Sequence, residues 1–297
     1  MAVERKTSRA ALWLILLGVG LLSVLPFVWV IAGSFKDESA IVAGKVWPWQ
    51  QYEVRRAAPD GGEMRRVEER LTLANYRQVA TKVSGLSTYY FNTLYLSVAG
   101  TFLTLVVGTL AAYGFARFRF LGSKIMFGLF LFTIMIPGEV TLIGRFELMV
   151  NLRLLDTVTG LLAAYVAGNL ILVIFIMRNV FEAVPQDLCD AAMIDGASSW
   201  EVLWEVMVPM GRNGIAACGI LTFLSIWNEF FFALTFTFRS DTRTLPVGIT
   251  MLRSQWGIMD KGVLFATVLL SFLPIVIVFI LLQKYFVRGL SAGALKQ

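Results

Sequence analysis

Six long runs of apolar residues constrain this chain more than any other feature. Each run is uncharged or nearly so, and they cover residues 10–35, 83–116, 125–144, 157–177, 213–238 and 262–283. A helix needs about 20 apolar residues to cross the hydrocarbon core of a bilayer. The second run is longer than that, so we expect its first residues to lie outside the membrane. The runs predict an all-α membrane protein with six transmembrane helices.

Composition supports this class and excludes several others. Only 15% of the residues are charged, against about 25% in soluble domains. The net charge of +6 comes without a basic patch interleaved with aromatics, so we expect no nucleic-acid partner. There is no histidine, which excludes histidine metal ligands, proton relays and triads. Two cysteines without a CxxC motif predict neither a disulfide framework nor a metal site.

Lysines and arginines near the ends of the runs predict the orientation, because cytoplasmic loops carry an excess of them. Three groups place both termini and the second and fourth loops in the cytoplasm: Arg5, Lys6 and Arg9; Arg117, Arg119 and Lys124; Lys284, Arg288 and Lys296. The first loop, with nine basic and seven acidic residues, does not follow this pattern cleanly, nor does the fifth. The first apolar run exceeds a signal-peptide core of about 7–15 residues, so we expect an uncleaved anchor.

The chain then divides into five parts. We expect a cytoplasmic N-terminus (1–9), a first transmembrane helix (10–35), an external loop (36–82), a five-helix core (83–286) and a cytoplasmic tail (287–297). The core includes a cytoplasmic loop at 179–212, between the fourth and fifth helices. The external loop carries a polar insertion at about 51–70, with a Pro-Asp-Gly-Gly turn. This insertion is a solvated segment, a small hairpin or a helical arm, and the first is favoured.

The stretch DAAMIDGASSWEVLWEVMVP, residues 190–209, departs from the apolar character of the chain. Gly196 permits a left-handed end to a first short helix. Ser198 followed by Glu201 is a capping box, which predicts the start of a second helix. One face of that helix is expected to carry Trp200, Leu203, Trp204 and Met207, and Pro209 is expected to end it. The stretch is too short and too charged to span a bilayer.

Two interpretations of this stretch remain open from the pattern alone. It is an interfacial helix lying on lipid, or an element that docks into a groove of a cytoplasmic protein. Its polar face is acidic and the lipid of the inner leaflet is anionic, which favours docking.

The same stretch resembles the EAA loop of binding-protein-dependent ABC importer permeases. The matching residues are Ala191, Ala192, Asp195, Gly196, Ala197 and Pro209. Two positions depart from the pattern: Asp190 stands where glutamate is usual, and Cys189 where a second acid is common. The resemblance implies that an ATPase subunit is contacted by Asp190, Ala191, Ala192, Asp195, Gly196, Ala197, Trp200, Leu203, Trp204 and Pro209.

Further segments resemble the carbohydrate (maltose-type) branch of that family. They are NTLYLSVAGTFLTLVVGTLAAYGFARFRF, MIPGEVTLI, WNEFFFALTF and the tail GLSAGALKQ, which is similar to the smaller permease subunit. The resemblance implies a second permease in a heterodimer, two ATP-binding subunits and an extracytoplasmic solute-binding protein. It also implies a bacterial or archaeal inner membrane, a sugar or polyol as solute, and a tail contact to the ATPase through Ser291, Gly293 and Lys296.

No enzymatic role is expected of this chain. It contains no GxxxxGK[ST] motif, so ATP and Mg are expected on the partner ATPase and no cofactor is expected here. The runner-up functions are an importer permease for another solute, such as a phosphorylated polyol or a peptide, and a self-contained secondary transporter or channel. The latter leaves the capped stretch unexplained, and the sequence shows no inverted repeat.

Polar residues inside the runs are candidate substrate contacts. Glu139 follows Pro137-Gly138, a break that predicts a discontinuous helix lining a cavity, and Glu229 follows Trp227-Asn228. Acids within a membrane are functional by default. They form a polar vestibule for a hydroxyl-rich solute or bond neighbouring helices. The proposed pathway residues are Glu139, Asn169, Thr222, Ser225, Asn228 and Glu229. Small residues from Gly100 to Ala116, at every fourth position, predict close helix packing within the chain or against a partner permease.

Overall fold

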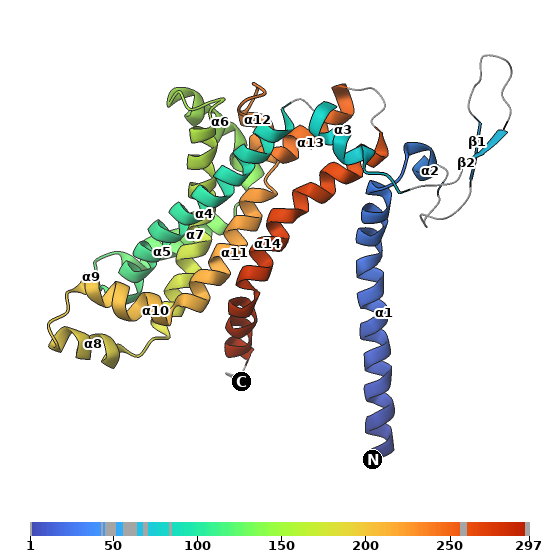
Figure 1. Cartoon of the computed structure of the whole chain (residues 1–297). Coiled ribbons are helices and arrows are strands. Elements are labelled where there is room, and N and C mark those ends of the chain that lie inside the picture. Colours follow the sequence, from blue (N-terminus) through green and yellow to red (C-terminus); the bar gives the residue numbers. More distant parts are fainter. Residues whose placement is uncertain are drawn as a thin grey trace. The chain divides into compact units, whose positions relative to one another are not determined.

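The computed structural model describes residues 2–42, 44, 52–55, 64–67, 71–82, 85–255 and 260–294 (Figure 1). It divides into two compact units, and each is described by itself. The first comprises residues 1–84 and 249–273, and the second comprises 85–248 and 274–297. The described residues are helical apart from one pair of short strands. This agrees with the predicted class, and the strand pair is the exception to it.

Four helices in the described part are long and apolar enough to cross a membrane. They lie in α1 (Ala2–Ser34), α4 (Leu86–Arg117), α7 (Val158–Glu182) and α14 (Lys261–Ala294). Two bent pairs of helices also pass the test together, so the number of spans lies between four and six. Helix α4 begins at Leu86 and has 32 residues, more than a span needs.

The third apolar run is broken. Helix α5 (Ser123–Ile134) is followed by a 3-10 turn, η1 (Gly138–Thr141), and by α6 (Leu142–Asn151), at an angle of 100°. The break lies at Pro137, whose ring fixes φ and removes a backbone donor. The fifth run is interrupted as well: α11 (Arg212–Trp227) ends before Asn228 and the chain resumes as α12 (Phe231–Phe236). The discontinuous helix predicted at Pro137-Gly138 is therefore confirmed, and the fifth run is not one continuous helix either.

In the second unit, α4 packs along both α7 and α11 (Figure 1). The small residues of α4 lie in these contacts. A Cβ atom on Gly100 would lie 2.7 Å from Cδ1 of Ile226, and one on Gly108 would lie 2.6 Å from Cγ1 of Val173. Real Cβ atoms essentially never show contacts under 3.0 Å. These two glycines therefore serve packing within the chain, the first of the two predicted alternatives.

The first unit ties the end of α1 to α3 (Ala74–Lys82) and to the start of α14. The buried Asn75 amide donates to the backbone oxygens of Ser34 (2.9 Å) and Lys36 (2.8 Å). These bonds satisfy carbonyls that the end of α1 leaves open. A Cβ atom on Gly262 would lie 2.4 Å from that amide nitrogen, so the start of α14 approaches it closely. Helix α2 (Glu38–Val42) lies between α1 and the strands in the chain.

The polar insertion contains a hairpin-type pair. Strand β1 (Tyr52–Arg55) pairs antiparallel with β2 (Met64–Val67), in the register Tyr52 with Val67 and Arg55 with Met64. The hairpin alternative is therefore confirmed for these eight residues. The Pro-Asp-Gly-Gly turn between them lies outside the described residues.

Candidate functional site

Residues 186–210 form two helices joined by a tight turn, and we call them the two-helix segment. Helix α8 (Gln186–Ile194) is followed by a turn at Gly196, which has a φ of 95°. The N–H of Ala197 donates to Ala192 (2.9 Å), and that of Gly196 donates to Met193 (3.1 Å). This is the Schellman arrangement that satisfies the last carbonyls of a helix. The left-handed glycine predicted from the sequence is confirmed.

A capping box opens the second helix. The Ser198 hydroxyl accepts from the Glu201 N–H (3.3 Å), and the Glu201 carboxylate accepts from the Ser198 N–H (2.6 Å). The bond from the backbone N–H of Ser198, followed by the bond from its hydroxyl, lowers the pKa of the Glu201 carboxyl. The predicted capping box is therefore confirmed, and it fixes where α9 (Ser199–Glu201) begins.

Pro209 does not end this helix, which is a correction to the sequence prediction. The chain continues from α9 through a π-helical turn, η2 (Val202–Met207), into α10 (Val208–Met210), and the bend to α11 lies at Gly211. In the π-helical turn the N–H of Val208 donates to the oxygen of Leu203, five residues back. That widened turn precedes Pro209 and lets the ring follow without the clash it has in a regular helix.

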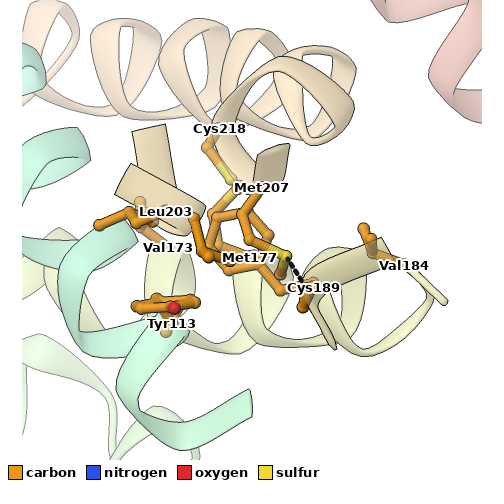
Figure 2. Packing of buried hydrophobic residues seen from close by; sticks show 11 residues of the cluster. Tyr113, Val173, Met177, Val184, Cys189, Leu203, Met207 and Cys218 are labelled. Atoms are coloured by element: carbon orange, nitrogen blue, oxygen red, sulfur yellow. Dashed lines mark hydrogen bonds between the residues drawn. The ribbon is translucent and has the colours of Figure 1, made fainter. Parts of the chain in front are cut away.

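One side of the two-helix segment belongs to a buried core (Figure 2). Leu203 is 1% exposed and Met207 is 0% exposed. The Cys189 thiol is also buried and lies 3.5 Å from the sulfur of Met207. The core continues into α4, α7 and α11 through Tyr113, Val173, Met177, Phe181 and Cys218. An apolar residue therefore suits position 189, where the resembled family commonly has an acid.

The other side is exposed and carries a pair of tryptophans. Trp200 is 59% exposed and Trp204 is 41% exposed, with ring centroids 5.5 Å apart in an edge-to-face arrangement. The predicted single apolar face is thus divided: Leu203 and Met207 pack inward, while the indoles face outward. The π-helical turn changes the angular spacing that a regular helix would give. Five acids and no lysine or arginine occur in the segment: Asp187, Asp190, Asp195, Glu201 and Glu205.

Arg117 and Tyr113, which the sequence did not single out as site residues, connect α4 to this segment. The Tyr113 hydroxyl donates to the backbone oxygen of Ser199 (3.0 Å). The Arg117 guanidinium donates to the backbone oxygens of Phe181 and Val184, just before α8. In the sequence, Arg117 indicated only the orientation of the chain. Its position at the end of an apolar run was the one available signal.

Glu229 lies at the break between α11 and α12. Its carboxylate accepts from the Tyr165 hydroxyl (2.6 Å) and from the N–H groups of Phe232 (2.7 Å) and Ala233 (3.0 Å). It thereby accepts from N–H groups at the start of α12 that have no partner within that helix. Its bond with Tyr165 joins α12 to α7. This arrangement corresponds to the helix-bonding alternative for an acid within a membrane.

The remaining predicted pathway residues are not joined to Glu229 by any bond found in the described residues. Glu139 lies exposed in η1. Asn169 and Asn228 each donate to the backbone of their own helix, at Tyr165 and Leu224. In α11, Thr222 is buried and Ser225 is exposed.

A second polar centre lies just before the start of α7, around Asp156. Its carboxylate accepts from the Thr242 hydroxyl (2.6 Å) and from the N–H groups of Phe238 (2.8 Å) and Arg239 (3.2 Å). Burial alone would raise the pKa of this carboxyl. The hydrogen bonds from Thr242, Phe238 and Arg239 and the charge of Arg239 outweigh it, so the pKa lies below its ordinary value.

Two further predictions have limited structural counterparts. Among the described residues, no group of three or more cysteine, aspartate or glutamate side chains is placed to hold a metal ion. In the tail, Ser291 and Gly293 lie within α14, where only the backbone is described, and Lys296 lies outside the described residues.

Comparisons with known proteins agree with the permease resemblance. Residues 104–292 match the family model described as "Binding-protein-dependent transport system inner membrane component". The trehalose/maltose transport system permease protein of Thermococcus litoralis is 31% identical over 95% of this chain and 96% of that protein. The arabinooligosaccharides transport system permease protein of Halalkalibacterium halodurans is 30% identical over 99% of this chain and 100% of that protein.

A solved structure shares the fold. One chain of a bacterial ABC transporter involved in the import of the polysaccharide alginate superposes with a TM-score of 0.77 at 24% identity. The match covers 94% of this chain and 97% of that one. The family match spans more than half of this sequence, and the two relatives cover almost all of it. The chain therefore belongs to the family of binding-protein-dependent transport system inner membrane components, and it is a non-enzymatic permease subunit of an importer.

Proposed function

We propose that this chain forms half of the translocation pathway of an ATP-driven importer, with its two-helix segment docked into a cytoplasmic ATP-binding subunit. The other half is a second permease in a heterodimer. Two ATP-binding subunits carry ATP and Mg, and an extracytoplasmic binding protein delivers the solute. The role of this chain is mechanical: closure of the ATPase moves the two-helix segment, and the spans switch between outward and inward access.

The observation that carries the docking proposal is the divided surface of the two-helix segment. Leu203 and Met207 on its inner side are buried in the core, so the segment is held in a fixed position on the rest of the second unit. Its outer side exposes Trp200 and Trp204, and tryptophan is enriched among residues that dominate binding energy. The segment carries five acids and no lysine or arginine, so an anionic lipid surface would repel it. A protein groove with an apolar floor and a basic rim fits this surface.

We place both termini and the two-helix segment in the cytoplasm, with six spans. Two features support the count. The bent pair of α5 with η1 and α6 passes the length and hydropathy test, and α11 lies in the fifth apolar run and follows the two-helix segment after a 76° bend. Taken as the fifth span, α11 would start at the cytoplasmic side, as the loop bases Arg117, Arg119 and Lys124 also require. The EAA loop then lies between the fourth and fifth spans.

The solute is a sugar or a related polyol. The relatives that match over nearly their whole length are named for arabinooligosaccharides and for trehalose and maltose. The candidate pathway residues are hydroxyl, amide and carboxyl groups, which suit a hydroxyl-rich solute. They are Glu139, Asn169, Thr222, Ser225, Asn228 and Glu229.

Glu229 tests whether that polar region acts in transport. Glu229→Ala leaves the N–H groups of Phe232 and Ala233 without their acceptor, which shifts α12 at the break. We expect lower uptake with unchanged assembly of the complex, measured by transport in vesicles and by co-purification. Normal uptake by an assembled variant would reject the pathway role.

A mild-detergent purification of the tagged chain, followed by mass spectrometry, tests the proposed function as a whole. We expect an ATP-binding subunit and a second permease in fixed ratio. Purification of the chain alone, with solute transport in vesicles that contain no ATP, would reject the proposal in favour of a self-contained transporter.

A further inference from the structure

Arg117 occupies an unusual position at the last residue of α4. One nitrogen of its guanidinium, Nη2, donates to the backbone oxygens of Phe181 (2.9 Å) and Val184 (2.7 Å). Phe181 lies in the last turn of α7 and Val184 lies two residues after its end, and the carbonyl end of a helix carries partial negative charge. The other nitrogen, Nη1, donates to the side-chain oxygen of Gln186, the first residue of α8. The planar guanidinium of Arg117 thus joins α4, α7 and α8.

The contacts continue into the two-helix segment. The Gln186 amide donates in turn to the carboxylate of Asp190 (2.9 Å), one turn further along α8. Arg117 Nη2 also lies 3.7 Å from the sulfur of Met207, on the second helix. One turn earlier in α4, the Tyr113 hydroxyl bonds the backbone of Ser199. Both helices of the segment are therefore held by the last turns of α4.

The same helix is bonded at its other end. The Asn92 amide donates to the backbone oxygens of Asp241 (2.8 Å) and Arg243 (3.0 Å). The Thr93 hydroxyl accepts from the N–H of Leu245 (2.7 Å). Asn92 and Arg117 are 25 positions apart in α4, which is about 37 Å at 1.5 Å per residue. Figure 1 shows α4 running from the α8–α10 end of this unit to the α6 and α12 end.

We propose that Arg117 is a positioning residue that makes the end of α4 move together with the two-helix segment. The proposal rests on the proposed function, because it is docking to an ATPase that would displace the segment. Without the guanidinium, α8 would rotate about residues 183–185 and the end of α4 would not move with it. With it, a displacement of α8 is carried into α4, which packs on α7 and α11 and reaches the loop at 241–245.

The test measures a distance in the assembled complex and needs no knowledge of the solute. Spin labels are placed at Leu121→Cys, in the turn after α4, and at Ile194→Cys, at the end of α8. Both positions are exposed, whereas the native Cys189 and Cys218 are buried. Double electron–electron resonance is recorded for the complex in liposomes, without nucleotide and with ATP and vanadate.

With Arg117 present, the distance distribution is expected to be the same in both states. With Arg117→Ala, the ATP–vanadate state is expected to gain a second distance, with about a tenfold change in relative populations for the loss of bonds to a charged donor. Arg119→Ala is the matched control, because Arg119 is an exposed arginine two residues further on. That control is expected to behave like the parent.

A merely structural role is distinguished by the nucleotide dependence. It would alter the distribution equally in both states, and that result would overturn the proposal. An ATP-dependent distance change with Arg117 intact would overturn it as well.

Gln186→Leu covers the case in which Arg117→Ala does not assemble. It removes the relay to Asp190 while keeping the two guanidinium–carbonyl bonds, so a smaller ATP-dependent change is expected. The double variant should match Arg117→Ala alone, because both changes act on one network. A Gln186→Leu complex identical to the parent in both states would contradict the relay.

Failure of the proposed function is recognised separately. It would appear as the absence of any ATP-binding subunit in the purified parent complex, before any label is introduced, and would remove both proposals. A complex that assembles and hydrolyses ATP, but whose label distances disagree with these expectations, rejects the role of Arg117 alone.

Discussion

The two ends of α7 are organised by opposite charges. Two residues before its start, the Asp156 carboxylate collects N–H and hydroxyl donors from the loop after α12. At its end, the Arg117 guanidinium of α4 collects carbonyl acceptors. Each charge complements the helix terminus it faces, because N-termini favour anions and C-termini favour cations. Asp156 joins the loop before α7 to the loop after α12, and Arg117 joins α4 to the end of α7 and the residues that follow it.

The difference lies in what each centre holds. Asp156 joins two loops that each expose a single large apolar side chain, Leu152 and Phe238. Arg117 holds a segment that exposes Trp200 and Trp204. We therefore expect changes near Asp156 to act on stability and changes near Arg117 and the two-helix segment to act on coupling to ATP.

The largest effect is expected from Gly196→Val. Gly196 has a φ of 95°, and a left-handed conformation costs an ordinary residue about 1–2 kcal/mol, and a β-branched one more. The turn between α8 and α9 would reorganise and move the tryptophans, so we expect at least about a tenfold fall in solute transported per ATP. Uptake and ATP hydrolysis by the complex in liposomes provide this ratio.

Gly196→Asn is the control for that change. No atom lies within 4 Å of a Cβ built at position 196, so backbone strain rather than a clash is being tested. Asparagine tolerates the left-handed region and is expected to transport at near the parental ratio. Equal ratios for valine and asparagine would contradict the role given to the turn.

Asp156→Ala is expected to destabilise the chain without uncoupling it. Three hydrogen bonds to a charged acceptor are lost, which amounts to about 2 kcal/mol of unfolding free energy. Thermal unfolding of the purified complex should show a lower Tm, while the solute-to-ATP ratio should stay parental. Asp241→Ala is the control, since it removes only an exposed ion pair with Arg239 (3.2 Å). Uncoupling by Asp156→Ala would erase the contrast between the two ends.

The Asp156 centre is also expected to respond to pH. Its carboxyl has a lowered pKa in the folded chain, so its contribution to stability is present above the unfolded value of about 3.9. That contribution is lost as the pH falls through the folded pKa. The difference in Tm between the parent and Asp156→Asn should be constant from neutral pH down to that region and then vanish. A difference that grows on acidification would have the wrong sign.

The smallest effect is expected from Glu201→Ala. It removes one half of the capping box, and Glu201 is solvent-exposed. Ser198 still caps the helix through its hydroxyl, so we expect a small loss of affinity for the ATP-binding subunit and a parental transport ratio. Titration of the purified ATPase onto the permease complex measures the affinity. Full uncoupling by this change would show that the position of α9 depends on Glu201 alone.

Local features could be predicted where one short motif determines the geometry. The left-handed Gly196 and the Ser198–Glu201 capping box follow from residues a few positions apart. The break at Pro137-Gly138 was likewise visible, because proline cannot continue a helix regularly. The apolar runs predicted the long helices, since length and hydropathy are properties of contiguous sequence.

Other features depended on contacts between distant parts of the chain. The π-helical turn, which separates Leu203 from Trp204 and carries the helix past Pro209, has no simple residue signature. The contacts of Arg117 and Asp156 join residues that lie 64 to 86 positions apart. A basic residue after an apolar run has the same pattern whether it marks orientation or bonds a neighbouring helix terminus. Only the three-dimensional arrangement separates the two.

The central claim is that the exposed tryptophan side of the two-helix segment contacts an ATP-binding subunit. A photo-crosslinking phenylalanine analogue at position 204 in the intact complex tests it most directly, with the same analogue at exposed position 241 as the control. We expect an adduct between position 204 and the ATP-binding subunit, and none to that subunit from position 241. Adducts from position 204 to lipid, or to another subunit instead, would contradict the claim.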